Sequence, residues 1–60
     1  MIRTKRRDLV KLLEKNGWRL KRHGGSHDIY TDGKNTESIS HEREIDEPLA
    51  KAIIKRRGLK

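Results

Sequence analysis

The chain has 60 residues, which allow a single domain over residues 1–60 with a thin core, since such a domain buries only ~60% of the surface that its unfolded chain exposes. The absence of cysteine excludes disulfides and thiolate metal sites, and the lack of an apolar signal region or membrane-spanning run predicts a cytoplasmic protein. Sixteen Lys and Arg against nine Asp and Glu give a net charge of +7, which favours nucleic acid or an acidic protein as partner over a membrane surface.

The N-terminal segment predicts an amphipathic helix. Thr4 can cap a helix that runs to about Asn16, and Gly17 can end it in the left-handed conformation. Apolar side chains recur there at helical spacing and predict a buried stripe that consists of Leu9, Val10, Leu12 and Leu13.

Three short segments follow, and each has the character of a strand. Residues 18–23, 27–32 and 36–41 are separated by "GGS" and by "DGKN", which predicts an antiparallel meander of three strands. In the first strand Trp18 and Leu20 alternate with basic residues, so both are expected to face the core.

A second helix is predicted after Asp46, which is its expected N-cap, and it should end at Gly58. Its expected buried stripe consists of Leu49, Ala50, Ile53 and Ile54. The order is α-β-β-β-α, and the few apolar residues suffice to cover one sheet face only. We therefore expect a two-layer α+β fold in which both helices pack on one face of the sheet and the other face stays open.

The chain resembles the HicA toxins, the small ribonucleases of HicA/HicB toxin–antitoxin pairs, over nearly all of its length. The resemblance is carried by "LLEKNGW", by "GGSHDIY" and by "EIDEPLAKAIIKRRGL". It implies a fold like that of double-stranded RNA-binding domains, cleavage of mRNA without a cofactor, and inhibition by a HicB-type antitoxin. It also implies that His27, which follows the Gly-Ser turn, is the functional histidine. Many members have a second histidine or an apolar residue where this chain has Asp28.

Cleavage of RNA without a metal needs a group that takes the 2′-hydroxyl proton, cations near the phosphorus and an acid for the leaving oxygen. Imidazole suits the first role, because its unperturbed pKa of about 6.5 leaves much of it neutral near physiological pH. We therefore predict that His27 is a general base or acid, although a solvated histidine at a strand start is the alternative. The residues predicted to bind RNA are Lys21, Arg22, Gly24, Gly25, Ser26 and Tyr30.

The orientation of His27 is left open by the sequence. Strand alternation places it on the same face as Ile29, so it points to the helices if Ile29 does. The alternatives are that the strand begins after His27, that a bulge turns it, or that it lies at the rim between the sheet and the first helix, where its ring could still reach RNA. Tyr30 then faces the open side, where it could stack on a base or anchor the antitoxin, with cross-strand packing as the alternative.

Two further histidines, His23 and His41, lie at predicted strand ends. Either could be the acid, although idle exposed rings are the alternative. No metal site is predicted, because "GGS" between His23 and His27 argues against the helix that their spacing would require, and no third ligand is evident.

Two other functions remain possible on the same fold. One is a non-catalytic module that binds single-stranded RNA, since Glu44, Asp46 and Glu47 at the start of the second helix disfavour double-stranded RNA. The other is a basic protein-interaction module whose surfaces at residues 21–22 and 55–57 dock an acidic partner. Direct DNA binding is not expected, because the sequence has no helix-turn-helix signature.

Overall fold

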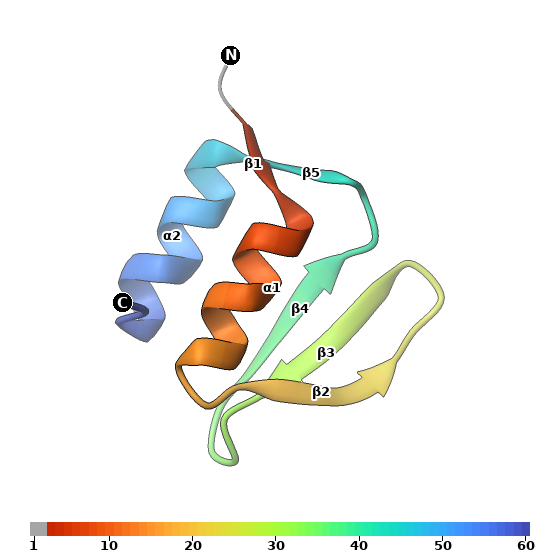
Figure 1. Cartoon of the computed structure of the whole chain (residues 1–60). Coiled ribbons are helices and arrows are strands. Elements are labelled where there is room, and N and C mark those ends of the chain that lie inside the picture. Colours follow the sequence, from red (N-terminus) through yellow and green to blue (C-terminus); the bar gives the residue numbers. More distant parts are fainter. Residues whose placement is uncertain (1–2) are drawn as a thin grey trace.

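The computed structural model describes residues 3–60. Its elements are β1 (Arg3–Lys5), α1 (Arg6–Lys15), β2 (Arg19–His23), β3 (His27–Thr31), β4 (Thr36–Ser40), β5 (Glu44–Asp46) and α2 (Glu47–Arg57). Strands β2, β3 and β4 form an antiparallel sheet in that order, so the predicted α-β-β-β-α fold is confirmed (Figure 1). The sequence did not predict β1 and β5, which pair with each other in a separate two-stranded ladder.

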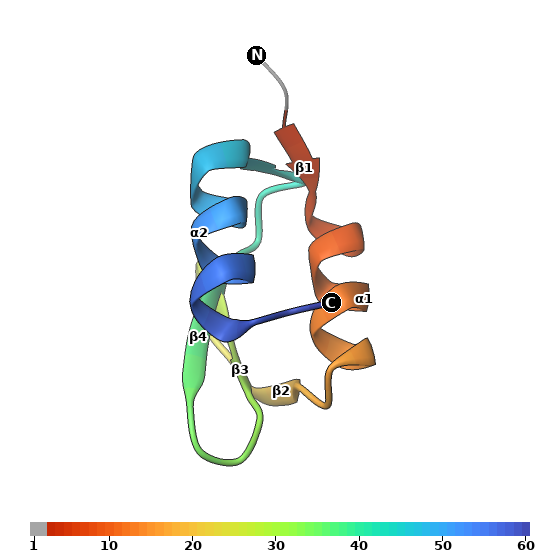
Figure 2. The ribbon, with the colours of Figure 1, turned by 90° about the vertical axis from the view of Figure 1, so that its left-hand side faces the viewer.

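The ladder of β1 and β5 sets the start of both helices. Thr4 lies opposite Ile45 in this antiparallel pair, and Lys5 lies opposite Glu44. The prediction that Thr4 caps α1 was therefore wrong, because pairing with β5 keeps Thr4 in a strand and Lys5 takes the N-cap position instead. Since α1 follows β1 and α2 follows β5, the two helices start side by side and run in the same direction (Figures 1 and 2).

The other predicted helix ends are confirmed. Gly17 has a φ of 86°, which a residue with a Cβ rarely adopts, and it follows the last turn of α1. Asp46 is the N-cap of α2, and Gly58 ends this helix in the left-handed conformation with a φ of 61°.

The core lies between the two helices and one face of the sheet. Its buried apolar residues are Leu9, Leu13, Trp18, Tyr30, Ile39, Ile45, Ala50, Ile53 and Leu59. The prediction that Trp18 packs in the core is confirmed, whereas Leu20 and Leu49, which were also expected there, are 49% and 53% exposed. Leu20 lies on an edge strand, and Leu49 lies in the first turn of α2, while Ala50 and Ile53 form the buried stripe.

The alternation of β3, which the sequence left open, places Tyr30 rather than Ile29 against the helices. Asp28 and Tyr30 are buried against the helices, whereas Ile29 is half-buried and His27 is exposed on the open face. The prediction that Tyr30 faces the open side was therefore wrong, since its ring is only 6% exposed. With two aromatic side chains in the whole chain, the thin core takes both of them.

An irregularity in β2 changes which side chains face the helices. Leu20 lies opposite Tyr30, but Arg22 lies opposite Ile29, so Lys21 is an extra residue without a partner in β3. One extra residue reverses the alternation of a strand. Arg22 consequently faces the open side with Ile29, and the next residue of β2, His23, pairs with Asp28 and faces the helices.

A buried carboxylate joins the end of α2 to β4. Glu37 is 8% exposed, and it accepts hydrogen bonds from Arg56 at 2.9 Å and from Arg57 at 2.5 Å. The Arg57 guanidinium also lies 5.7 Å from the centre of the Trp18 ring. The expected basic surface at residues 55–57 is therefore partly committed to the fold, because Arg56 and Arg57 both pair with Glu37.

Candidate active site and nucleic-acid interface

The Gly-Gly-Ser turn joins β2 to β3, and His27, the first residue of β3, lies on the open side. A Cβ on Gly24 would collide with the carbonyl oxygen of His27, whereas one on Gly25 would meet open space. Gly24 is therefore required by the backbone of the turn itself. Ser26 Oγ lies 3.1 Å from His27 Nδ1, which leaves Nε2 of the exposed ring directed away from the serine.

His27 lies along a surface groove of about 460 Å³, called here the histidine groove. It is lined by residues 25–27 and by residues from the end of β4, the loop after β4, β5 and the start of α2, including His41, Glu44 and Leu49. Leu49, which is exposed rather than buried in the core, is thus an apolar residue that lines this groove together with His27 and His41.

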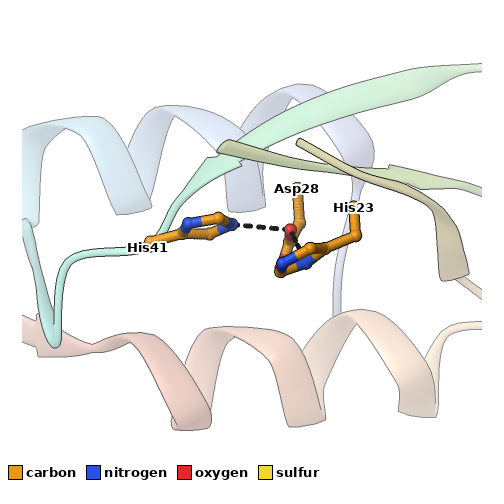
Figure 3. A group of neighbouring side chains, drawn as sticks. All are labelled: His23, Asp28 and His41. Atoms are coloured by element: carbon orange, nitrogen blue, oxygen red, sulfur yellow. Dashed lines mark hydrogen bonds and ion pairs between the residues drawn. The ribbon is translucent and has the colours of Figure 1, made fainter. Parts of the chain in front are cut away.

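A second arrangement of side chains gathers around Asp28, and we call Arg6, His23, Asp28 and His41 the Asp28 cluster. His41 Nε2 lies 2.6 Å and His23 Nδ1 lies 2.7 Å from the same carboxylate oxygen, Oδ1 (Figure 3). Arg6 Nη2 lies 2.7 Å from the other oxygen, Oδ2. The two imidazole rings stack with their centroids 5.0 Å apart and their planes inclined by 17°.

The carboxylate of Asp28 determines which nitrogen of each neighbouring ring carries the hydrogen that faces it. The hydrogen bond from His41 lowers the pKa of Asp28, burial raises it, and the charges of His23, His41 and Arg6 lower it, so that the pKa lies below its usual value. An ionised carboxylate only accepts hydrogen bonds, so both rings must present an N–H to Oδ1. His41 Nδ1 is therefore the nitrogen that this ring has left for other partners.

Arg6 ties the Asp28 cluster to the backbone. Its Nε donates to the carbonyl oxygen of Ser40 at 2.7 Å, and its backbone N–H donates to the carbonyl oxygen of Arg43 at 2.9 Å. The first turn of α1 is thereby held against the end of β4 and the loop that follows. This contact positions His41, which lies in the same loop.

A second surface groove, of about 600 Å³, has strongly positive walls. It is lined by Lys5, Arg6, Arg7, His41, Arg43 and Glu44, and we call it the basic groove. Arg6 is paired with Asp28. Among the other lining residues, the positive charges of Lys5, Arg7 and Arg43 exceed the single negative charge of Glu44. Because His41 and Glu44 line both grooves, the basic groove and the histidine groove adjoin at these two residues.

The structure separates the predicted site residues into two groups. Gly25, Ser26, His27 and His41 lie along the histidine groove, and Arg22 faces the open side next to this region. Lys21 is exposed at the bulge of β2. Gly24 has the structural role described above.

Two predicted residues, Tyr30 and His23, lie elsewhere. The buried Tyr30 cannot offer its ring to a base, and His23 contacts Asp28 on the side of the helices. The roles of Arg6, Asp28 and Arg43 were missed. Asp28 was singled out only as a departure from the family pattern, and no local pattern shows that Arg6 and Arg43 meet.

The fold and these surfaces define a small, basic α+β domain with an exposed histidine on the open side of its sheet. The family model for the HicA toxin of bacterial toxin–antitoxin systems matches residues 6–59, so the chain belongs to the HicA toxin family. It is thus a toxin of a toxin–antitoxin system, with a cognate antitoxin as partner. Neither the curated proteins nor the solved structures gave a match. Within residues 3–60, no helix is long and apolar enough to cross a membrane.

Proposed function

We propose that the chain is a metal-independent endoribonuclease that cleaves mRNA, with His27 as the proton-transfer group. The observation that carries this proposal is an exposed imidazole whose Nδ1 is held by Ser26 at the rim of a groove that contains a second histidine, His41. Membership of the HicA toxin family supports the same reaction. A HicB-type antitoxin would inhibit the enzyme by covering the histidine groove.

The proposed reaction is an attack by the 2′-hydroxyl oxygen of RNA on the adjacent phosphorus. When His27 Nδ1–H donates to Ser26 Oγ, Nε2 is free to take the hydroxyl proton as the new O–P bond forms. The bond from phosphorus to the 5′-oxygen breaks, and that oxygen takes a proton from an acid. His41 is the proposed acid, because Asp28 fixes its ring and leaves Nδ1 available beside the groove.

The basic groove is the proposed path of the RNA backbone toward His41 and His27. Lys5, Arg7 and Arg43 provide positive charge along it, and phosphate oxygens are the groups that such side chains bind. The acidic residues at the start of α2 would repel the second strand of a duplex, so single-stranded RNA is the favoured form.

Replacing Arg43 by glutamine should weaken the binding of single-stranded RNA without unfolding the protein, because Arg43 is exposed in a loop. Loss of one phosphate contact should reduce the slope of log K against log salt by about 0.7. Fluorescence anisotropy of a labelled RNA at several salt concentrations measures both effects. Lys15→Gln, at the other end of α1, is the matched control, and equal salt slopes for both variants would argue against the basic groove.

The proposed activity is tested with a defined single-stranded RNA in the presence of EDTA. We expect cleavage that leaves a 2′,3′-cyclic phosphate and a 5′-hydroxyl, and no cleavage where one 2′-deoxynucleotide replaces the nucleotide before the cleaved bond. Cleavage at the deoxynucleotide would rule out attack by the 2′-hydroxyl. Intact binding without any cleavage would instead favour a non-catalytic RNA-binding module.

A further inference from the structure

We infer that the Asp28 cluster also binds a divalent transition-metal ion such as Zn²⁺, with His23, Asp28 and His41 as ligands. Each residue offers one donor atom, and the three donor atoms lie within 4.8 Å of one another. The three residues come from the end of β2, the start of β3 and the loop after β4, which is why their spacing in the sequence shows no metal motif. This inference does not depend on the proposed ribonuclease activity.

The geometry of the three donor atoms is close to that of a metal site. His41 Nε2 and His23 Nδ1 lie 2.6 and 2.7 Å from Asp28 Oδ1, and both rings approach this one oxygen (Figure 3). In a tetrahedral zinc site with bonds of about 2.0–2.1 Å, neighbouring donor atoms are about 3.3 Å apart. Each ring therefore has to move away from Oδ1 by less than about 1 Å, while the ion replaces the two ring protons. The two ring nitrogens lie within 4.8 Å of each other and have to reach the same spacing of about 3.3 Å.

The space needed for this change is available at His23. Its side chain is 73% exposed, compared with 32% for His41 and 9% for Asp28. Two ligands are thus held in place by the fold, and the third can adjust its rotamer to the ion. A site of three protein ligands also leaves a coordination position for water or for a partner.

Arg6 acts on this site from outside. It binds Asp28 through Oδ2 and anchors itself on the carbonyl oxygen of Ser40, so it orients the carboxylate while leaving Oδ1 to the rings. Its positive charge also opposes the charge of the ion. The expected affinity is consequently lower than that of a structural zinc site with four ligands, which suits an exchangeable ion.

The donor set selects the class of ion. Two imidazole nitrogens and one carboxylate oxygen favour Zn²⁺, Co²⁺, Ni²⁺ or Cu²⁺, whereas Mg²⁺ and Ca²⁺ prefer sites made of oxygen atoms. A bound ion would link the ends of β2 and β3 to the loop after β4 and would fix His41. It should therefore stabilise the fold, and it should inhibit cleavage if His41 takes part in the reaction.

The test is a titration of the purified protein with Co²⁺ in a buffer free of chelators, followed by competition with Zn²⁺. We expect visible d–d absorption that Zn²⁺ abolishes, and a higher midpoint of thermal unfolding with Zn²⁺. His23→Ala removes a ligand from an exposed position, so folding is not at risk, and the apparent affinity should fall about tenfold or more.

His27→Ala is the matched control, since His27 is also an exposed histidine beside the turn between β2 and β3 but lies outside the donor set. It should bind the ion as the wild type does, and Asp28→Asn should bind it more weakly. The inference is overturned if the wild type shows neither the absorption nor the thermal shift, or if His23→Ala retains the wild-type affinity. Because these readouts measure binding, they neither support nor oppose the proposed cleavage of RNA.

Discussion

Replacing His27 by alanine is expected to lower the rate of RNA cleavage by ~10²–10⁴-fold, the usual contribution of one positioned acid or base. The physical reason is that the variant has no group beside Ser26 that can take the 2′-hydroxyl proton. His27 is exposed at the start of β3, so its side chain contributes little to the core and the fold should persist. The measurement is single-turnover cleavage of a defined RNA, with RNA binding and circular dichroism recorded for the same samples.

The control for His27 is a variant that keeps the shape of the side chain without its proton chemistry. His27→Gln should bind RNA as the wild type does and should still fail to cleave it. His41→Gln should also lose activity if His41 is the acid, although its ring has the additional task of pairing with Asp28. Equal cleavage by the wild type and His27→Ala would show that another residue transfers the proton and would refute the role proposed for His27.

Replacing Glu37 by glutamine should destabilise the fold by about 2–3 kcal/mol. The variant leaves Arg56 and Arg57 without the charge that holds the end of α2 against β4. The loss should stay below the ~3–5 kcal/mol of a fully buried pair, because the Arg56 side chain is 53% exposed and can turn to water. A domain of this size has ~3–5 kcal/mol from its core, so this loss would remove a large part of its stability.

The measurement for Glu37 is urea unfolding followed by circular dichroism. Trp18 fluorescence is avoided because the Arg57 guanidinium lies over the Trp18 ring, so the substitution can change the surroundings of the ring in the folded state. Glu14→Gln is the matched control, because Glu14 is an exposed glutamate on α1 and its loss should change the unfolding free energy by about 0.5 kcal/mol or less. A Glu37→Gln variant as stable as this control would show that the two arginines contribute packing rather than charge.

The same carboxylate makes stability depend on pH. Burial raises the pKa of Glu37, but the hydrogen bonds and charges of Arg56 and Arg57 lower it by more than burial raises it. The pKa in the folded state therefore lies below the ordinary 4.5. The stabilisation is therefore present above pH 4.5 and is lost as the pH falls through the folded pKa. In Glu37→Gln the unfolding free energy should fall less steeply over this acidic range than in the wild type.

The order of the two helices and the three strands of the larger sheet was predicted because each has a local sequence signal. The leucines of α1 recur at helical spacing, Gly17 and Gly58 end the helices as expected, and Asp46 begins α2. The pairing of Thr4 with Ile45 was missed because the two residues are 41 positions apart, and the β1 and β5 segments have three residues each. Strands of three residues are too short to show an alternation of apolar and polar side chains in the sequence.

The candidate site was predicted in part for a related reason. His27 follows a recognisable turn, and its place at the start of β3 agrees with the pattern. The orientation of β3 was left open by the sequence, and Tyr30 was placed on the open face, whereas the core takes the Tyr30 ring. The meeting of His23 with Asp28 depends on the bulge at Lys21, and a bulge has no strong signal in a single sequence.

This bulge has a consequence for the association of separate molecules. Strand β2 lies at the edge of its sheet, and an edge strand presents unpaired backbone groups that can accept a strand from another chain. The irregular backbone at Lys21 opposes such pairing, because an added strand would find no regular ladder of hydrogen bonds there. The positive side chains of Arg19 and Arg22 also oppose it when the added strand is β2 of a second copy, because the two strands would repel each other. The extra residue Lys21, which places His23 on the side of the helices, thus also opposes aggregation through the edge of the sheet.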